Sequence, residues 1–182
     1  VFPETEETSA PVIERYLPSR DYEKHNRELK RARRFLKQRS QKTWFEIRLS
    51  AVIDPFLEEA RQLCEEWKEI ELAASDSGEE VPLCFCHGDY QYHNILRQDR
   101  GFFLVNFEKC QADGPVRDLY LLLRKLLEKS EWDAEWGRVL LAAYESVRPL
   151  KPYERQDLVY RLSYPEKLWK IVNFYYNSGK AW

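Results

Sequence analysis

Apolar residues change their spacing twice along this chain, and the two changes divide it into three parts. From Thr43 to about Ala74 they recur every three or four residues, the pattern of an amphipathic helix, in which Pro55 predicts a kink or a break. Between 83 and 105 short runs of β-branched and aromatic residues predict strands. From Arg117 onward the helical spacing returns. This order predicts an α+β fold that is predominantly α, with a small β-hairpin between two helical parts.

Capping and turn signals place the remaining elements. Residues 1–18, with three prolines and acidic residues, predict an extended lead-in. A helix is expected from Ser19 or Asp21 as N-cap to about Gln41. The polar run at 75–80 predicts a surface loop, and Ser130 with Asp133 predicts a capping box. Strands are expected at 83–86, 95–97 and 102–105, with a hairpin turn at 98–101, and the last helices at 153–162 and 165–176.

The bulk composition favours a single folded domain. A chain of 182 residues with 43% hydrophobic and 14% aromatic residues can bury one substantial core but not two. No stretch approaches the roughly 18 apolar residues of a membrane span, and no apolar leader precedes the four cysteines. We therefore expect no membrane association, and free thiols in a cytosolic protein.

Charge is unevenly distributed along the first half of the chain. Residues 20–48 carry eleven Lys or Arg against four acids, whereas residues 54–80 carry ten acids against two basic residues. Two neighbouring helices of opposite charge would compensate each other, which we favour over a nucleic-acid patch on the basic segment. With a formal net charge of −2 the chain has no overall attraction for nucleic acid, so we expect no nucleic-acid partner.

The stretch from Cys86 to Leu96, CHGDYQYHNIL, has the residue types of a phosphoryl-transfer loop. Asp89 precedes Asn94 by five residues, and the predicted hairpin brings residue 106 back toward this loop. Phosphoryl transfer needs an aspartate for the attacking hydroxyl, an asparagine oxygen for one metal ion and a carboxylate for another. Magnesium takes few protein ligands and completes its shell with phosphate and water.

This loop resembles that of the aminoglycoside phosphotransferase and choline kinase group of kinase-like folds, which reads His-Gly-Asp followed by Asn at the same offset. The segment LSYPEKLWKIVNFYYNSGKAW and the basic stretch LKQRSQKTWFE further resemble CotS-type spore coat proteins of endospore-forming bacteria, a branch of that group. The resemblance implies the C-terminal lobe of a protein-kinase-like fold, with ATP and Mg²⁺ as cofactors. It makes Asp89 the catalytic base, His87 a loop-shaping residue and Asn94 a metal and cofactor ligand. It also makes Asp118 the aspartate that holds the loop through its amides.

Two features depart from the family pattern. Asn106 stands where active relatives have a magnesium-binding aspartate, and a neutral amide should hold a divalent ion and its triphosphate less well. Glu108 is a secondary metal candidate, which would share the side of Asn106 only on a regular extended segment. The six glycines include no pair two residues apart, so no glycine-rich phosphate loop is present. We therefore expect a lead-in at 1–18 and a kinase-like C-terminal lobe at 19–182, with the N-terminal nucleotide lobe absent.

Other clusters have plainer interpretations. Cys84 and Cys86 would lie on the same face of a strand next to His87, but without a second ligand pair at metal spacing they are better explained as small core residues than as a zinc site. The aromatic residues of the C-terminal segment favour core and subunit contacts over a ligand cage; they are Trp169, Phe174, Tyr175, Tyr176 and Trp182.

Two functional hypotheses follow. In the first, the chain is the catalytic lobe of an ATP-dependent phosphotransferase that acts on a small-molecule hydroxyl, with Asn94 and either Asn106 or Glu108 at the metal. In the second, it is an inactive pseudokinase that serves as a structural or assembly protein of the spore coat, with other coat proteins as partners. The predicted location is the cytoplasm or the spore coat, and an exposed apolar face would favour a homodimer.

Overall fold

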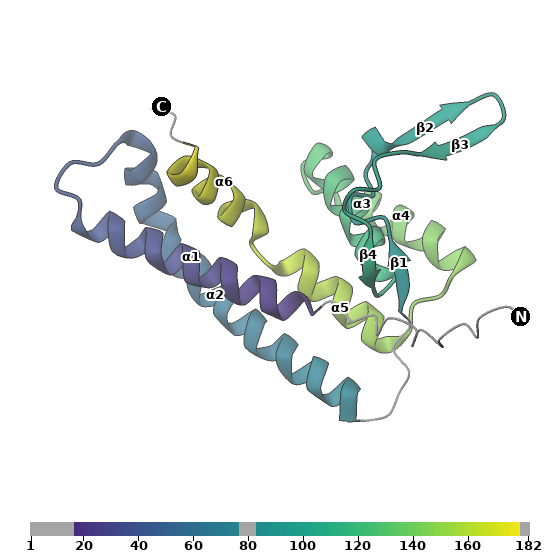
Figure 1. Ribbon diagram of the computed structural model, residues 1–182, viewed down its shortest axis with the longest axis horizontal. Coiled ribbons are helices and arrows are strands. Elements are labelled where there is room, and N and C mark those ends of the chain that lie inside the picture. Colours follow the sequence, from purple (N-terminus) through teal and green to yellow (C-terminus); the bar gives the residue numbers. More distant parts are fainter. Residues whose placement is uncertain (1–16, 77–82, 179–182) are drawn as a thin grey trace, which may run out of the picture.

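The computed structural model describes residues 17–76 and 83–178 and shows two helical groups joined by short strands (Figure 1). The long helices α1 (Pro18–Gln38) and α2 (Trp44–Asp76) form an antiparallel pair on one side, with α6 (Glu166–Asn177) beside α1. The other side holds α3 (Val116–Lys129) and α4 (Ala134–Val147), and α5 (Pro152–Ser163) lies between the two groups. The chain is therefore predominantly helical, as expected.

The pairing of α1 with α2 brings the basic and acidic segments together. Ion pairs join Arg33 to Asp54 and Lys68 to Glu23 across the two helices. The hydrophobic seam between them is continued by one residue of α6, and its buried members are Leu29, Ala32, Leu36, Leu49, Ile53, Leu57 and Val172. The charge compensation expected for neighbouring helices is thus present in the structure.

A second core lies between α3 and α5. Its buried residues recur on α3 at three- and four-residue spacing and are completed from α5 and the segment before it; they are Val116, Leu119, Tyr120, Leu123, Leu127, Leu150 and Leu158. A third cluster joins α5 to the helical pair and consists of Tyr22, Ala60, Cys64, Trp67 and Tyr164. Because α5 also contributes Leu158 to the second core, α5 and the turn after it connect the two helical groups.

Two small antiparallel sheets lie between α2 and α3 in the sequence. Strand β1 (Cys84–Cys86) pairs with β4 (Gln111–Asp113), and β2 (Ile95–Gln98) pairs with β3 (Gly101–Leu104) in a hairpin that projects from the body (Figure 1). The short 3-10 helix η1 (Tyr92–Asn94) leads into β2. The hairpin agrees with the expectation, whereas β4 was not predicted.

The structure corrects several sequence expectations. The lead-in predicted for residues 1–18 and most of the loop at 75–80 lie outside the described residues. Helix α1 has Leu17 rather than Ser19 or Asp21 as its N-cap, because Pro18 already occupies its first position. Helix α2 continues through Pro55 without a break.

Two further expectations concern caps and burial. Helix α4 is capped by Asp133, whose carboxylate accepts a hydrogen bond from the amide of Glu135 at 2.8 Å, while Ser130 ends α3 instead of opening a capping box. Strand β1 is not buried throughout: Cys84 and Phe85 are exposed and only Cys86 is buried. In this two-stranded sheet β4 pairs with one edge of β1, and the first two residues of β1 stay exposed.

All four cysteines are free thiols, and two of them lie close together. The sulfurs of Cys84 and Cys86 are 3.6 Å apart, so both side chains share a face as expected. Among residues 17–76 and 83–178 no group of three His, Cys, Asp or Glu side chains has the arrangement of a metal site. None of the helices described there combines the length and apolar character needed to cross a bilayer.

His25 gives the fold a predicted pH dependence. Its ring is buried and stacks on the ring of Trp169, with 3.5 Å between the ring centroids. Burial lowers the pKa of His25, and Lys170 lowers it further. The carboxylates of Glu166, Asp21 and Glu28 raise this pKa, but by less. Between its lowered pKa in the folded chain and about 6.5, the unfolded chain binds a proton that the folded chain does not. The free energy of unfolding should therefore decrease as the pH falls below about 6.5.

Urea unfolding at pH 7.5 and pH 5.8 tests this expectation. The substitution His25→Phe keeps an aromatic ring in the stack and should reduce the loss of stability between the two values. His93→Gln, at an exposed position, is the matched control and should retain the full loss. If the His25 variant and the original chain lost the same stability between the two pH values, titration of other groups would be the cause of the pH dependence.

Candidate functional site

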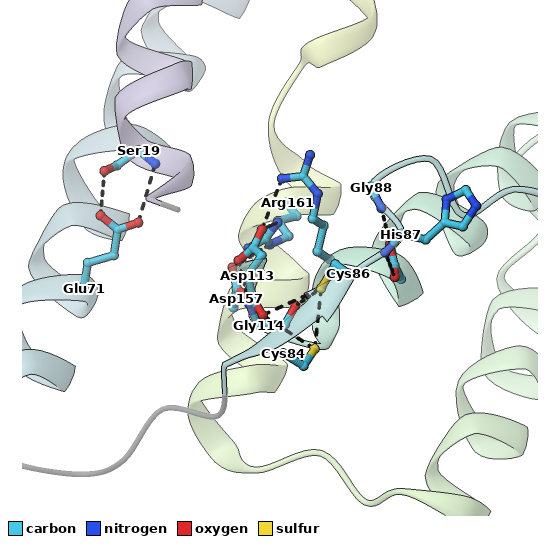
Figure 2. A network of polar contacts seen from close by, with 12 residues as sticks. Ser19, Glu71, Cys84, Cys86, His87, Gly88, Asp113, Gly114, Asp157 and Arg161 are labelled. Atoms are coloured by element: carbon cyan, nitrogen blue, oxygen red, sulfur yellow. Dashed lines mark hydrogen bonds and ion pairs between the residues drawn. The ribbon is translucent and has the colours of Figure 1, made fainter. Parts of the chain in front are cut away.

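The loop from His87 to Asn94 connects β1 to β2 and is held at the start of α3. Asp118 accepts hydrogen bonds from the backbone amides of His87 at 2.7 Å and Gly88 at 3.0 Å. Figure 2 shows His87 and Gly88 directly after Cys86 at the end of β1. The contact expected between Asp118 and the loop amides is therefore present, and it uses both carboxylate oxygens.

Gly88 allows the loop to pass close to the returning chain. Its φ is +75°, in the left-handed region that glycine adopts without strain. A β-carbon at this position would lie 2.0 Å from the carbonyl oxygen of Lys109, which is far inside van der Waals contact. The close approach explains why the His-Gly-Asp sequence needs glycine at its centre.

His87 bridges the loop to the segment that follows the hairpin. Its Nε2 lies 2.9 Å from the carbonyl oxygen of Val105, and its Nδ1 accepts a hydrogen bond from the amide of Asp89 at 3.2 Å. These partners fix the neutral tautomer with the proton on Nε2, because a carbonyl can only accept and an amide can only donate. Both ring nitrogens are used in shaping the loop, as the sequence analysis expected of this residue.

The carboxylate of Asp89 is paired with a cation. The Nζ of Lys109 lies 3.1 Å from Oδ2, and the side-chain amide of Gln91 donates to Oδ1 at 3.1 Å. The Asp89 side chain is 29% exposed and that of Lys109 is 65% exposed, so the pair lies at the surface. The ion pair of Lys109 with Asp89 was not predicted from the sequence, because no local pattern indicates a contact between residues 20 positions apart.

Asn94 and Asn106 bind each other. The side-chain amide of Asn106 donates to Oδ1 of Asn94 at 2.8 Å, and the amide of Asn94 donates to the carbonyl oxygen of Asp89 at 2.8 Å. Asn94 is buried, whereas Asn106 is exposed and has a φ of +67°. The hairpin thus brings residue 106 to the loop, as expected, and asparagine tolerates the left-handed conformation found there.

Glu108 does not meet the condition set for it as a metal ligand. That condition was a regular extended backbone from Asn106 onward, in which residues two apart share a side. The positive φ of Asn106 and the turn at residues 108–109 interrupt the alternation. Glu108 is exposed, and the structure gives no contact between its carboxylate and Asn94 or Asn106.

The oxygen donors at this site fit Mg²⁺ poorly. Asn94 and Asn106 are neutral, and the Oδ1 of Asn94 already accepts a hydrogen bond. The carboxylate of Asp89 is compensated by Lys109. Magnesium is a hard cation that binds proteins through carboxylates and phosphate oxygens. The three oxygen donors, two neutral amides and one carboxylate paired with a lysine, therefore offer Mg²⁺ almost no net negative charge.

A buried ion network fixes β4 against α5 behind the loop. Figure 2 shows Asp113 facing Arg161, whose guanidinium lies 3.2 Å from Asp113 Oδ1 and donates to Asp157 at 2.8 Å. Burial lowers the pKa of Arg161, but the carboxylates of Asp157 and Asp113 raise it by more, so the group is held in its charged form. No local sequence pattern indicates this pair, because 48 residues separate its members.

Cys86 belongs to the same region and has a packing role. Its sulfur lies 3.3 Å from the carbonyl oxygen of Gly114, and burial, with a further contribution from Asp118, raises the pKa of its thiol. A buried thiol with a raised pKa is unreactive as a nucleophile. Cys86 is thus a small core residue, as expected, whereas Cys84 is exposed.

Comparisons with known proteins agree with the geometry of the loop. A family model described as "Phosphotransferase enzyme family" matches residues 14–154. Spore coat protein S of Bacillus subtilis (strain 168) is 33% identical over 100 residues, which cover 54% of this chain and 28% of that protein. The chain thus spans less than a third of the length of this relative, and the resemblance to spore coat proteins is confirmed.

One solved structure shares the fold of this chain. An aminoglycoside phosphotransferase from Alicyclobacillus acidocaldarius subsp. acidocaldarius DSM 446 superposes with a TM-score of 0.79 and 20% identity, over 91% of this chain and 50% of that chain. A choline/ethanolamine kinase family protein from Mesorhizobium loti aligns with a TM-score of 0.46 and 18% identity, over 90% and 60% of the two chains. The first match confirms the kinase-like fold class, and this chain spans half of that structure.

Proposed function

Because this chain belongs to the phosphotransferase enzyme family, we propose that it is a pseudokinase domain that serves in the assembly of the bacterial spore coat. In this proposal the catalytic loop keeps its shape but no longer holds a metal ion. Residues 19–182 act as the kinase-like lobe, and other coat proteins or a second copy are the partners. The similarity to a spore coat protein supports the location.

The charge of the site carries this proposal. Lys109 compensates Asp89, and Asn106 supplies an amide where a metal-dependent enzyme needs a carboxylate. Phosphoryl transfer depends on metal ions to neutralise the charge that develops on the phosphate oxygens. A site without net negative charge lacks the means to retain such an ion, whichever nucleotide is offered to it.

A second candidate is ATP-dependent transfer to a small-molecule hydroxyl. Its support is the retained loop geometry, in which Asp118 orders the amides of His87 and Gly88. In that case Asp89 would accept the proton of the hydroxyl, and Asn94 with Asn106 or Glu108 would take the metal. ATP and Mg²⁺ would be the cofactors.

Binding of Mn²⁺ separates the two candidates. Titration of the chain with Mn²⁺, followed by the electron paramagnetic resonance signal of the free ion, should show no binding at the loop in the millimolar range. The double variant Asn106→Asp/Lys109→Met restores one carboxylate and releases another. It should bind at least about tenfold more tightly, both without and with ATP.

The variant Asn177→Asp/Lys37→Met changes the net charge by the same amount at exposed positions outside the loop and is the matched control. It should bind no better than the original chain. Saturable binding by the original chain that is lost in Asn94→Ala would favour the enzyme. Failure of the loop variant to gain affinity would refute the argument from charge.

A further inference from the structure

A groove between α2, α3 and α6 combines an apolar floor with a cationic rim. Its volume is about 590 Å³, and it lies between the start of α2, the middle of α3 and one face of α6. The apolar side includes Trp44, Ile171 and Phe174, which are 72%, 43% and 53% exposed. Large apolar side chains gathered in one exposed depression mark a binding site more often than chance exposure does.

The floor of the groove is formed by side chains that hold one another in place. The rings of Phe45 and Tyr175 stack at 4.2 Å, and the hydroxyl groups of Tyr175 and Thr43 are 2.8 Å apart. Thr43 is itself fixed by two hydrogen bonds with Glu46. The Thr43 hydroxyl accepts one from the backbone amide of Glu46, and the Glu46 carboxylate accepts one from the backbone amide of Thr43. The groove is therefore formed before any ligand enters.

The rim carries an excess of positive charge. Arg124, Lys125, Lys167 and Lys170 line the groove, and none of the lining residues is acidic. Glu166 lies 2.7 Å from Lys170 and 3.6 Å from Arg124, and Glu128 pairs with Arg124 and Lys167. Two carboxylates thus face four cations. Within the described part of the chain, the structure gives no ion-pair partner for Lys125.

We propose that this groove binds a small amphipathic anion, a molecule with an aromatic or apolar body and one carboxylate, sulfonate or phosphate group. The body would lie on Trp44, Ile171 and Phe174, and the anionic group would face Lys125. The volume is within the range of about 300–1,000 Å³ that is typical of pockets for single small ligands, which favours such a molecule over a folded partner. This inference goes beyond the proposed function and holds whether or not the loop transfers phosphate.

Two fluorescent probes with the same aromatic rings test the proposal. The anionic probe is 8-anilinonaphthalene-1-sulfonate, and the neutral probe is N-phenyl-1-naphthylamine. Trp44→Ala should weaken the binding of both about tenfold, because the apolar contact is shared. Lys125→Glu should weaken only the anionic probe, also about tenfold, and should leave the neutral probe within about twofold.

Matched controls replace the same residue types outside the groove. Trp136→Ala on α4 and Lys37→Glu on α1 are exposed and should leave both probes within about twofold of the original chain. Circular dichroism of each variant shows that the fold is retained. Equal loss of both probes in Lys125→Glu, or losses in the controls as large as those in the groove variants, would overturn the proposal.

A peptide arm separates the small molecule from a protein partner. The peptide Asp-Phe-Asp-Glu should bind more weakly than the anionic probe in competition titrations. If it bound about tenfold more tightly and responded to the same two substitutions, the groove would be a docking site for an acidic peptide instead. The readouts of this experiment and of the Mn²⁺ titration are separate, so one proposal can fail while the other stands.

Discussion

Replacing Gly88 with alanine is expected to destabilise the chain by about 3 kcal/mol or more, or to prevent folding. The new β-carbon would lie 2.0 Å from a backbone carbonyl oxygen, that of Lys109, and a backbone atom cannot rotate away as a side chain can. Relief requires the loop to move, which would break the hydrogen bonds from His87 and Gly88 to Asp118. Urea unfolding measures the change in the free energy of unfolding.

Gly101 provides the matched control for this substitution. Its φ of +132° is also unfavourable for alanine, but a β-carbon there would meet no atom within 4 Å. Gly101→Ala should therefore cost about 1–2 kcal/mol from backbone strain alone. If Gly88→Ala cost no more than Gly101→Ala, the close approach of the loop to Lys109 would not be a feature of the folded chain.

The elements predicted well from the sequence are those with local signals. Long runs of apolar residues at helical spacing gave the helices, and four polar or glycine residues between two apolar runs gave the hairpin of β2 and β3. The Asp118 contact was expected from the family pattern. These features depend on residues close in sequence or on the motif that carries the resemblance to the family.

The elements that were missed depend on distant partners. Strand β4 has only three residues, Gln111 to Asp113, too few for a period of two to be visible, and it exists because it pairs with β1. Ser19 was expected to cap α1, but its hydroxyl donates to Glu71 at 2.5 Å on the neighbouring helix. The pairing of β4 and the partner of the Ser19 hydroxyl are both tertiary contacts, which no pattern within a short window reports.

The pairing of Lys109 with Asp89 has the same origin and matters most for function. Two departures from the family pattern are visible in the sequence, Asn106 and the absence of a glycine-rich phosphate loop. The structure adds that the aspartate of the loop is itself compensated, since the same close approach that requires Gly88 brings Lys109 beside it. Restoring a carboxylate at residue 106 without removing this lysine would therefore leave the site only partly negative, which is why the proposed variant changes both.

Replacing Arg161 with methionine is expected to destabilise the chain by about 3–5 kcal/mol. Asp113 is 2% exposed and would lose the guanidinium of Arg161, which leaves Arg117, 3.2 Å from its Oδ2, as the cation beside it. Asp157 would lose the hydrogen bond from this guanidinium as well. Because β4 carries Asp113 and pairs with β1, which leads into the loop, the damage should reach the candidate site.

Hydrogen exchange and a rescue variant distinguish this mechanism from a simple loss of packing. The amides of His87 and Gly88 should exchange faster in Arg161→Met, and the double variant Asp113→Asn/Arg161→Met should recover at least about 1 kcal/mol, because the buried carboxylate that faced Arg161 is gone. Arg138→Met, which removes an ion pair with 72% and 68% exposed side chains, should stay within about 0.5 kcal/mol of the original chain. If the double variant were as unstable as the single one, the loss of stability would come from lost packing contacts around Arg161. The ion pair between Arg161 and Asp113 would then not be what holds β4 and β1 in place.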